Sequence, residues 1–130
     1  MLKPSLAALA ALALTATAAA AQPGSASQPI PLKMQRGTDV VVVRGVLRQN
    51  VDCCAYVFKA AAGQQLHWSE SGAAVRLVMT YPDGHVDGPG FANPLPLPAT
   101  GAYTLSVSPD LMAEGAFGRF TLKLRIPPLR

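Results

Sequence analysis

Residues 117–126 read FGRFTLKLRI, and this stretch decides the class of fold. Apolar and polar side chains alternate along it. Because successive side chains of a β-strand point to opposite faces, the alternation predicts a strand with one face in a core and the other in water. The predicted inward residues are Phe120, Leu122, Leu124 and Ile126, and the predicted outward residues are Arg119, Thr121, Lys123 and Arg125.

Further short segments upstream also have strand character. We expect strands over residues 38–47, 52–60, 64–70, 73–81 and 102–108, with turns at 61–63, 71–72 and 82–84. The last turn is Pro82-Asp83-Gly84, in which proline presets φ and glycine accepts a positive φ. No segment after residue 21 has the apolar period of an amphipathic helix, about 3.6 residues. Short strands with turns every 8 to 12 residues or so predict an antiparallel β-sandwich or barrel.

Two connections are irregular. Residues 85–99 contain Pro89, Pro94, Pro96 and Pro98, and such spacing predicts an extended, polyproline-like segment along a sheet edge. Residues 109–115 fit either one helical turn or a loop.

Length and composition are those of one small globular domain. The chain has 130 residues, of which 50% are hydrophobic and 14% are charged, and this low charge excludes a disordered chain. We expect one inter-sheet layer of Tyr56, Phe58, Trp68, Tyr103 and Phe120. Burial of each contributes about 1.5–3 kcal/mol.

The first 21 residues read as a secretory signal peptide. Lys3 supplies the positive start, residues 6–14 are an unbroken Leu/Ala run, and Ala19-Ala20-Ala21 offers a cleavage site. The apolar run is shorter than the roughly 20 residues of a spanning helix, so we expect no membrane span after cleavage. Residues 22–37 then form a flexible leader and residues 38–130 the folded domain. The predicted location is periplasmic or secreted, which makes a nucleic-acid partner improbable.

Three stretches carry a family resemblance. Residues 56–66, YVFKAAAGQQL, and residues 97–105, LPATGAYTL, resemble runs of bacterial pre-peptidase C-terminal (PPC-type) domains, and Pro82-Asp83-Gly84 is similar to a turn in them. The resemblance covers residues 38–126. It implies a jelly-roll-like antiparallel β-sandwich of about seven or eight strands, which acts as a non-catalytic module.

Some PPC-like proteins stand alone after a signal peptide, as this chain does, and these include periplasmic inhibitors of g-type lysozyme. The resemblance therefore implies a binding protein, which would inhibit a g-type lysozyme by inserting a loop into its cleft. The aromatic–Asn pair common in the fourth strand of such inhibitors is missing here, where residues 75–79 read VRLVM. The alternative is an envelope-associated module that binds a protein or cell-wall polymer without inhibition.

Two exposed, polar, glycine-bearing loops are the predicted binding segments, residues 69–73 and 82–90, because binding residues concentrate on loops of a rigid scaffold. The expected binding residues are Ser69, Glu70, Ser71, Asp83, His85 and Asp87.

Catalysis and cofactors have no support in the sequence. The segment around Ser69 lacks a G-x-S-x-G elbow, and no paired carboxylates, phosphate-binding glycine loop or C-x-x-C motif occurs. Asp83, His85 and Asp87 alternate in the manner of metal ligands, but a polar turn explains the same residues. We expect no enzyme activity, no cofactor and no metal.

Cys53 and Cys54 are adjacent and are the only cysteines. Three states remain open: a vicinal disulfide, an intermolecular disulfide through Cys53 that links a homodimer, or two free thiols. A catalytic thiol would need a base such as His67 or His85 nearby.

Basic residues lie on the predicted outer faces of the strands. They protect sheet edges against aggregation or form a face for an anionic partner. They are Arg44, Arg48, Arg119, Lys123 and Arg125.

Overall fold

The computed structural model describes residues 24–25, 28–34, 39–50 and 53–129. The predicted signal peptide, residues 1–21, lies outside these residues. Within them, no helix has the length and apolar character needed to cross a membrane.

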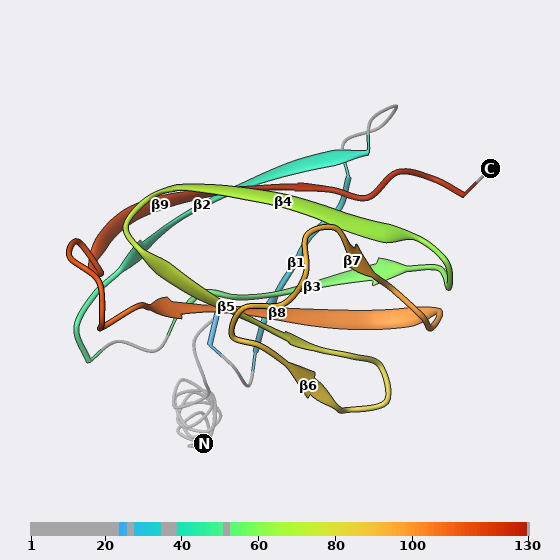
Figure 1. The fold of residues 1–130 in the computed structure, drawn as a ribbon, viewed down its shortest axis with the longest axis horizontal. Coiled ribbons are helices and arrows are strands. Elements are labelled where there is room, and N and C mark those ends of the chain that lie inside the picture. Colours follow the sequence, from blue (N-terminus) through green and yellow to red (C-terminus); the bar gives the residue numbers. More distant parts are fainter. Residues whose placement is uncertain (1–23, 26–27, 35–38, 51–52, 130) are drawn as a thin grey trace, which may run out of the picture.

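The described chain is all β, with nine strands in two sheets (Figure 1). Three of these strands have only two residues each, which accounts for the excess over the predicted seven or eight. The strands are β1 (Ile30–Pro31), β2 (Val40–Leu47), β3 (Ala55–Ala60), β4 (Gln65–Gly72), β5 (Val75–Thr80), β6 (Val86–Asp87), β7 (Leu95–Pro96), β8 (Gly101–Pro109) and β9 (Gly118–Arg125).

The two sheets pack face to face around one core. One sheet has the strand order β1-β3-β8-β5-β6, and the other has the order β2-β9-β4-β7. Every described pairing of strands is antiparallel except that of β1 with β3. Buried side chains from both sheets belong to a single cluster, so the arrangement is sandwich-like. Its fully buried members include Tyr103 and Leu105 of β8, and Leu122 and Leu124 of β9.

The alternation predicted for residues 117–126 is confirmed. Phe120, Leu122, Leu124 and Ile126 are buried, whereas Arg119, Lys123 and Arg125 are exposed. β9 lies between β2 and β4, so its backbone is paired along both edges.

β4 is longer than predicted, and the turn expected at 71–72 is wrong. Gly72 still pairs with Phe120 of β9, and the chain crosses to the other sheet at Ala73 and Ala74. The Ala73 N–H donates to the Arg119 C=O at 2.8 Å, which carries the pairing one residue beyond the strand. Ser69 and Ser71 therefore lie in a strand and not in a loop.

Two boundaries near the start of the domain also differ. The strand predicted from residue 52 begins at Ala55, because Cys54 has a positive φ of 74° that interrupts an extended backbone. Ile30 and Pro31, which we placed in the flexible leader, pair with Tyr56 and Val57 of β3. Part of the leader is thus bound to the five-stranded sheet.

The predicted aromatic layer is confirmed except for Trp68. Phe58 stacks on Tyr103 with ring centroids 5.6 Å apart, and both rings are buried. Trp68 is only partly buried and lies at the edge of the core, where it contacts Phe91 edge to face. The reason is that β7 covers β4 only at Gln65 and Leu66, so the next inward position is open on one side.

The proline-rich segment runs along sheet edges, as predicted. It contains β6 at one end of the five-stranded sheet and β7 at one end of the four-stranded sheet, and Pro96 lies in β7. Of the two alternatives for residues 109–115, the loop is the one found: Pro109 ends β8, and residues 111–115 form turns and a bend.

Candidate functional site

A compact turn joins β5 to β6, and we call this turn together with β6, residues 81–87, the hairpin tip. Tyr81 N–H donates to the His85 C=O at 2.9 Å, and Gly84 N–H donates to the Tyr81 C=O at 2.8 Å. The Tyr81 and His85 rings stack with centroids 4.0 Å apart. Figure 1 shows this hairpin at the margin of the sandwich, on the side away from β2 and β9. The tip is therefore held by contacts among its own residues, and the buried Tyr81 ring also packs it on the core, edge to face with Tyr103 of β8 at 5.5 Å.

Asp83 and His85 are the exposed groups of the hairpin tip, with side chains 70% and 55% exposed. The Asp83 carboxylate accepts from the His85 N–H at 3.0 Å, and its Oδ1 lies 2.6 Å from the His85 Nδ1. These two contacts, the backbone one foremost, lower the pKa of Asp83 below its ordinary value. The turn thus fixes a carboxylate and an imidazole side by side in water.

Asp87 braces the base of the hairpin tip. The Tyr81 hydroxyl donates to Asp87 Oδ2 at 3.2 Å. Burial, and then the bond to Asp87, raise the pKa of Tyr81, so this hydroxyl stays protonated and remains a donor. Of the predicted residues, Asp83 and His85 thus meet in the turn, whereas Asp87 lies in β6 and is connected to them through Tyr81.

The other predicted residues are separated by the geometry of β4. Ser69 and Ser71 pair with Lys123 and Thr121 of β9 and share the outer face of the four-stranded sheet. Glu70, between them, points to the opposite side. The three residues therefore form no common loop.

Glu70 lies in a groove between the edges of the two sheets, with a volume of about 300 Å³. We call it the edge groove. Pro89 and Gly90 also line it, so parts of the two predicted binding segments do meet there. Its lining comprises Trp68, Glu70, Val75, Arg76, Leu77, Pro89, Gly90, Phe91 and Asp110.

Two carboxyl groups affect each other in the edge groove. Partial burial of the Glu70 carboxyl, and then repulsion from Asp110, raise the pKa of Glu70. Asp110, Phe91 and Arg76 were not predicted as site residues. The signal that was available is the two-residue spacing of Trp68 and Glu70, which places both on one face of a strand.

The outer face of the four-stranded sheet is basic. Lys123 and Arg125 line a hollow of about 230 Å³ together with His67, Trp68 and Ser69. Arg125 lies 3.7 Å from the Asp39 carboxylate.

Cys53 and Cys54 form a disulfide with each other, with an S–S distance of 1.99 Å. The suggested disulfide-linked homodimer is therefore wrong, because neither sulfur remains to bond a second copy. The same bond removes both thiols as catalytic nucleophiles. Both sulfurs face the Val46 carbonyl oxygen, at 3.5 Å from Cys53 and 3.9 Å from Cys54.

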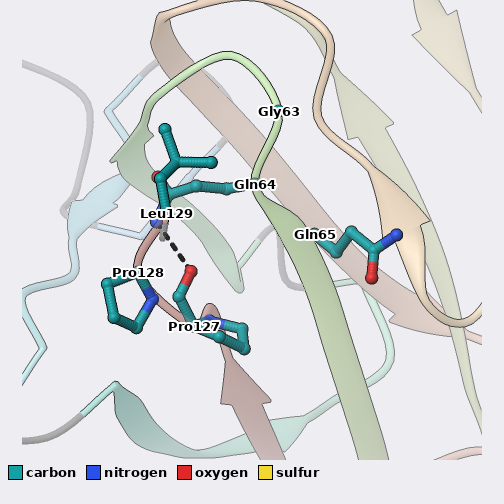
Figure 2. Close-up of a pocket in the computed structure, with 6 residues that line it drawn as sticks. All are labelled: Gly63, Gln64, Gln65, Pro127, Pro128 and Leu129. Atoms are coloured by element: carbon teal, nitrogen blue, oxygen red, sulfur yellow. Dashed lines mark hydrogen bonds between the residues drawn. The ribbon is translucent and has the colours of Figure 1, made fainter.

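A further hollow of about 220 Å³ lies where the last residues pass the 61–64 turn (Figure 2). The Gln64 Nε2 donates to the Pro127 C=O at 3.0 Å, and the Gln64 Oε1 accepts from the Ala61 N–H at 2.7 Å. No charged side chain lines this hollow. The Gln64 side chain thus connects Pro127 to the 61–64 turn through two hydrogen bonds.

Metal ligands do not gather in the described part of the chain, where no three His, Cys, Asp or Glu side chains are placed to hold an ion. In the hairpin tip, Asp83 contacts His85 while Asp87 contacts Tyr81.

The fold is similar to that of three solved structures. They are PliG from Salmonella Typhimurium (21% identity, TM-score 0.60), a PliG mutant from Escherichia coli (20%, 0.62) and PliG from Aeromonas hydrophila (20%, 0.59). The alignments cover 82–83% of this chain and 100% of each of those chains. Each is described as a periplasmic inhibitor of g-type lysozyme.

At these identities the likeness establishes the fold. No protein-family model matches the chain, and no curated protein matches it in sequence. The PPC-type resemblance is therefore not confirmed.

Proposed function

We propose that this chain is an exported, non-catalytic binding protein that inhibits a g-type lysozyme by inserting the hairpin tip into the enzyme's substrate cleft. The observation that carries the proposal is the build of the tip, in which stacking and hydrogen bonds hold Asp83 and His85 in one exposed arrangement. The fold likeness to three inhibitors of g-type lysozyme supports the same function.

The physical basis of inhibition is preorganisation. A loop that is ordered before binding loses little conformational entropy on entering a cleft, so more of its contact energy becomes affinity. Asp83 and His85 present a carboxylate and an imidazole to the partner, and hydrogen bonds to charged groups are stronger than neutral ones. With the tip inserted, the two sheets behind it cover the cleft and keep the substrate out.

An inhibition assay tests the proposal. Purified protein is added to a g-type lysozyme acting on cell-wall substrate, and the residual lysis is measured. We expect inhibition at micromolar protein, and a loss of at least about tenfold in potency for the Asp83→Ala/His85→Ala double variant, since central contact residues cost about 1–2 kcal/mol or more.

Glu114→Gln is the matched control, because Glu114 is an exposed acid on another loop. Its potency should equal that of the parent protein. Undiminished lysis at micromolar protein contradicts the function, and equal potency of the double variant contradicts insertion of the hairpin tip.

Export is the second part of the proposal. It rests on the N-terminal pattern of residues 1–21 and on the periplasmic description of the three structural neighbours. N-terminal sequencing of protein from a periplasmic extract should begin at Gln22. Full-length protein confined to the cytoplasm contradicts export.

The basic outer face favours a second candidate, an envelope module that binds an anionic cell-wall polymer. Lys123 and Arg125 line an open hollow there. Such binding should weaken strongly with salt, because exposed charges are screened at physiological ionic strength. Cosedimentation with purified cell walls measures it, and Lys123→Glu should reduce it. Unchanged cosedimentation of the variant excludes this face as the binding surface.

A further inference from the structure

β4 has one paired edge and one largely free edge. It pairs with β9 over residues 67–72, whereas β7 pairs only with Gln65 and Leu66. Two residues further on, at Trp68, the Asn93 side chain makes the two backbone hydrogen bonds that a neighbouring strand would make. The Trp68 N–H donates to Asn93 Oδ1 at 3.3 Å, and Asn93 Nδ2 donates to the Trp68 C=O at 2.7 Å.

Beyond Trp68, the backbone N–H and C=O groups on this side of β4 are available to another strand. In an antiparallel pair, residues whose N–H and C=O point toward the neighbouring strand alternate with residues whose groups point away. Because the groups of Trp68 point away from β9, those of Glu70 and Gly72 point away as well. In the described part of the chain, no strand pairs with this side of β4 at Glu70 or Gly72.

The edge groove runs beside this free edge. Trp68 and Phe91, in edge-to-face contact with centroids 5.5 Å apart, supply aromatic surface, and Val75 and Leu77 add apolar surface. Leu111 and Met112 follow Asp110 on the adjoining loop and are 70% and 93% exposed. These two residues add exposed apolar surface next in the chain to Asp110, which lines the groove.

The acidic side chains of the edge groove favour a partner that carries a positive charge. Glu70 and Asp110 are close enough to repel each other, and Arg76 is the only basic side chain in the lining. A second cation placed between the two carboxylates relieves this repulsion. Lys and Arg fit the shape too, because their aliphatic stems lie along apolar surface while their charged ends reach polar groups.

We propose that the edge groove binds an extended segment of a partner protein that carries a Lys or Arg side chain. The segment adds to β4 as a further strand through the backbone of Glu70 and Gly72, and its cation lies between Glu70 and Asp110. This surface is separate from the hairpin tip and does not depend on lysozyme inhibition.

Trp68 makes the test direct, because it lines the edge groove and is the only tryptophan of the chain. Its fluorescence is titrated with the peptide acetyl-Val-Thr-Arg-Val-Thr-amide. A second peptide has Glu in place of Arg, and a third has the Arg peptide's alternate amides N-methylated. We expect saturable binding of the Arg peptide, at least tenfold weaker binding of the Glu peptide, and loss of binding after N-methylation.

The variants separate the carboxylates from the fold. Glu70→Gln/Asp110→Asn should weaken the Arg peptide at least tenfold, while Glu114→Gln, on the same loop as Asp110 but outside the lining, should bind as the parent does. Unfolding curves in urea confirm that each variant is folded.

No saturable change with the Arg peptide, equal binding of the Arg and Glu peptides, or undiminished binding by the double variant each overturns the proposal. Undiminished binding of the N-methylated peptide overturns strand addition. Lysozyme inhibition is measured on the same samples, so a failure of either surface is seen independently of the other.

Discussion

The hairpin tip and the edge groove are the two candidate binding surfaces, and they are built in different ways. The contacts that hold Asp83, His85 and Asp87 in the tip lie within residues 81–87, and only the buried Tyr81 ring also packs on the core, against Tyr103 of β8. The lining of the groove comes from β4, β5 and two loops, between residues 68 and 110. The difference teaches that a local surface can change without disturbing the sandwich, whereas an assembled surface depends on the packing behind it.

Truncation of Phe91 should have the largest effect. Phe91 is 7% exposed and packs on Trp68, so Phe91→Ala should lower the free energy of unfolding by about 3–5 kcal/mol. Val86 of the hairpin is 60% exposed, so Val86→Ala should change the free energy of unfolding by about 0.5 kcal/mol or less. Urea unfolding measures both. Equal losses of stability in the two variants would contradict the difference between the hairpin tip and the edge groove.

Two glycines provide the next test, because they have the same φ in different surroundings. Gly72 has a φ of +92° and Gly84 one of +93°. A Cβ at Gly72 would overlap the Arg119 carbonyl oxygen, whereas one at Gly84 would meet nothing within 4 Å.

Gly72→Ala should therefore cost about 3 kcal/mol, and Gly84→Ala only the backbone strain, about 1–2 kcal/mol. The difference between the two unfolding midpoints in urea isolates the packing contribution. A larger loss for Gly84→Ala would contradict the placement of Gly72.

The Tyr81 hydroxyl tests the base of the hairpin tip. Tyr81→Phe keeps the ring that stacks on His85 and removes only the bond to Asp87. We expect a loss of about 0.5–1.5 kcal/mol in urea unfolding, the net contribution of one hydrogen bond. Inhibition should weaken in parallel if the tip is the inserting element. Unchanged stability would show that Asp87 does not brace the turn.

The smallest effects concern pH, and they have opposite signs at the two surfaces. The pKa of Asp83 is lowered, so its ionised form stabilises the fold above the ordinary carboxyl pKa of about 3.9, and this contribution is lost as the pH falls through the folded-state pKa. The pKa of Glu70 is raised, so its protonated form is favoured below the ordinary value of about 4.3, and that stability is lost as the pH rises through the folded-state pKa.

Side-chain carboxyl titration by NMR measures both midpoints. Asp83 should titrate below its ordinary value and Glu70 above it. Asp110→Asn should lower the pKa of Glu70 without affecting Asp83. If the titration midpoint of Glu70 did not change in Asp110→Asn, the two carboxyl groups would not be neighbours.

Local patterns predicted the strands and the hairpin tip because the information lies within a few residues. The alternation in 117–126 places Phe120 and Leu122 inside, and Pro82-Asp83-Gly84 forms the expected turn. The same reasoning misplaced Ser71 and Gly72, because a glycine after a serine is a turn signal that pairing with β9 overrides. It also left Cys53 and Cys54 undecided between three states, one of which, the vicinal disulfide, is formed.

By itself, the sequence determined an all-β chain, the buried face of β9, and an exposed turn that carries Asp83 and His85. These follow from periodicity and from backbone preferences, which act between neighbours in the chain. Only the tertiary structure decided which edge of β4 stays free and that Trp68, Phe91 and Asp110 meet there. Such contacts depend on where two sheets stop covering each other, and residues 19 to 42 positions apart in the chain carry no local signal of that.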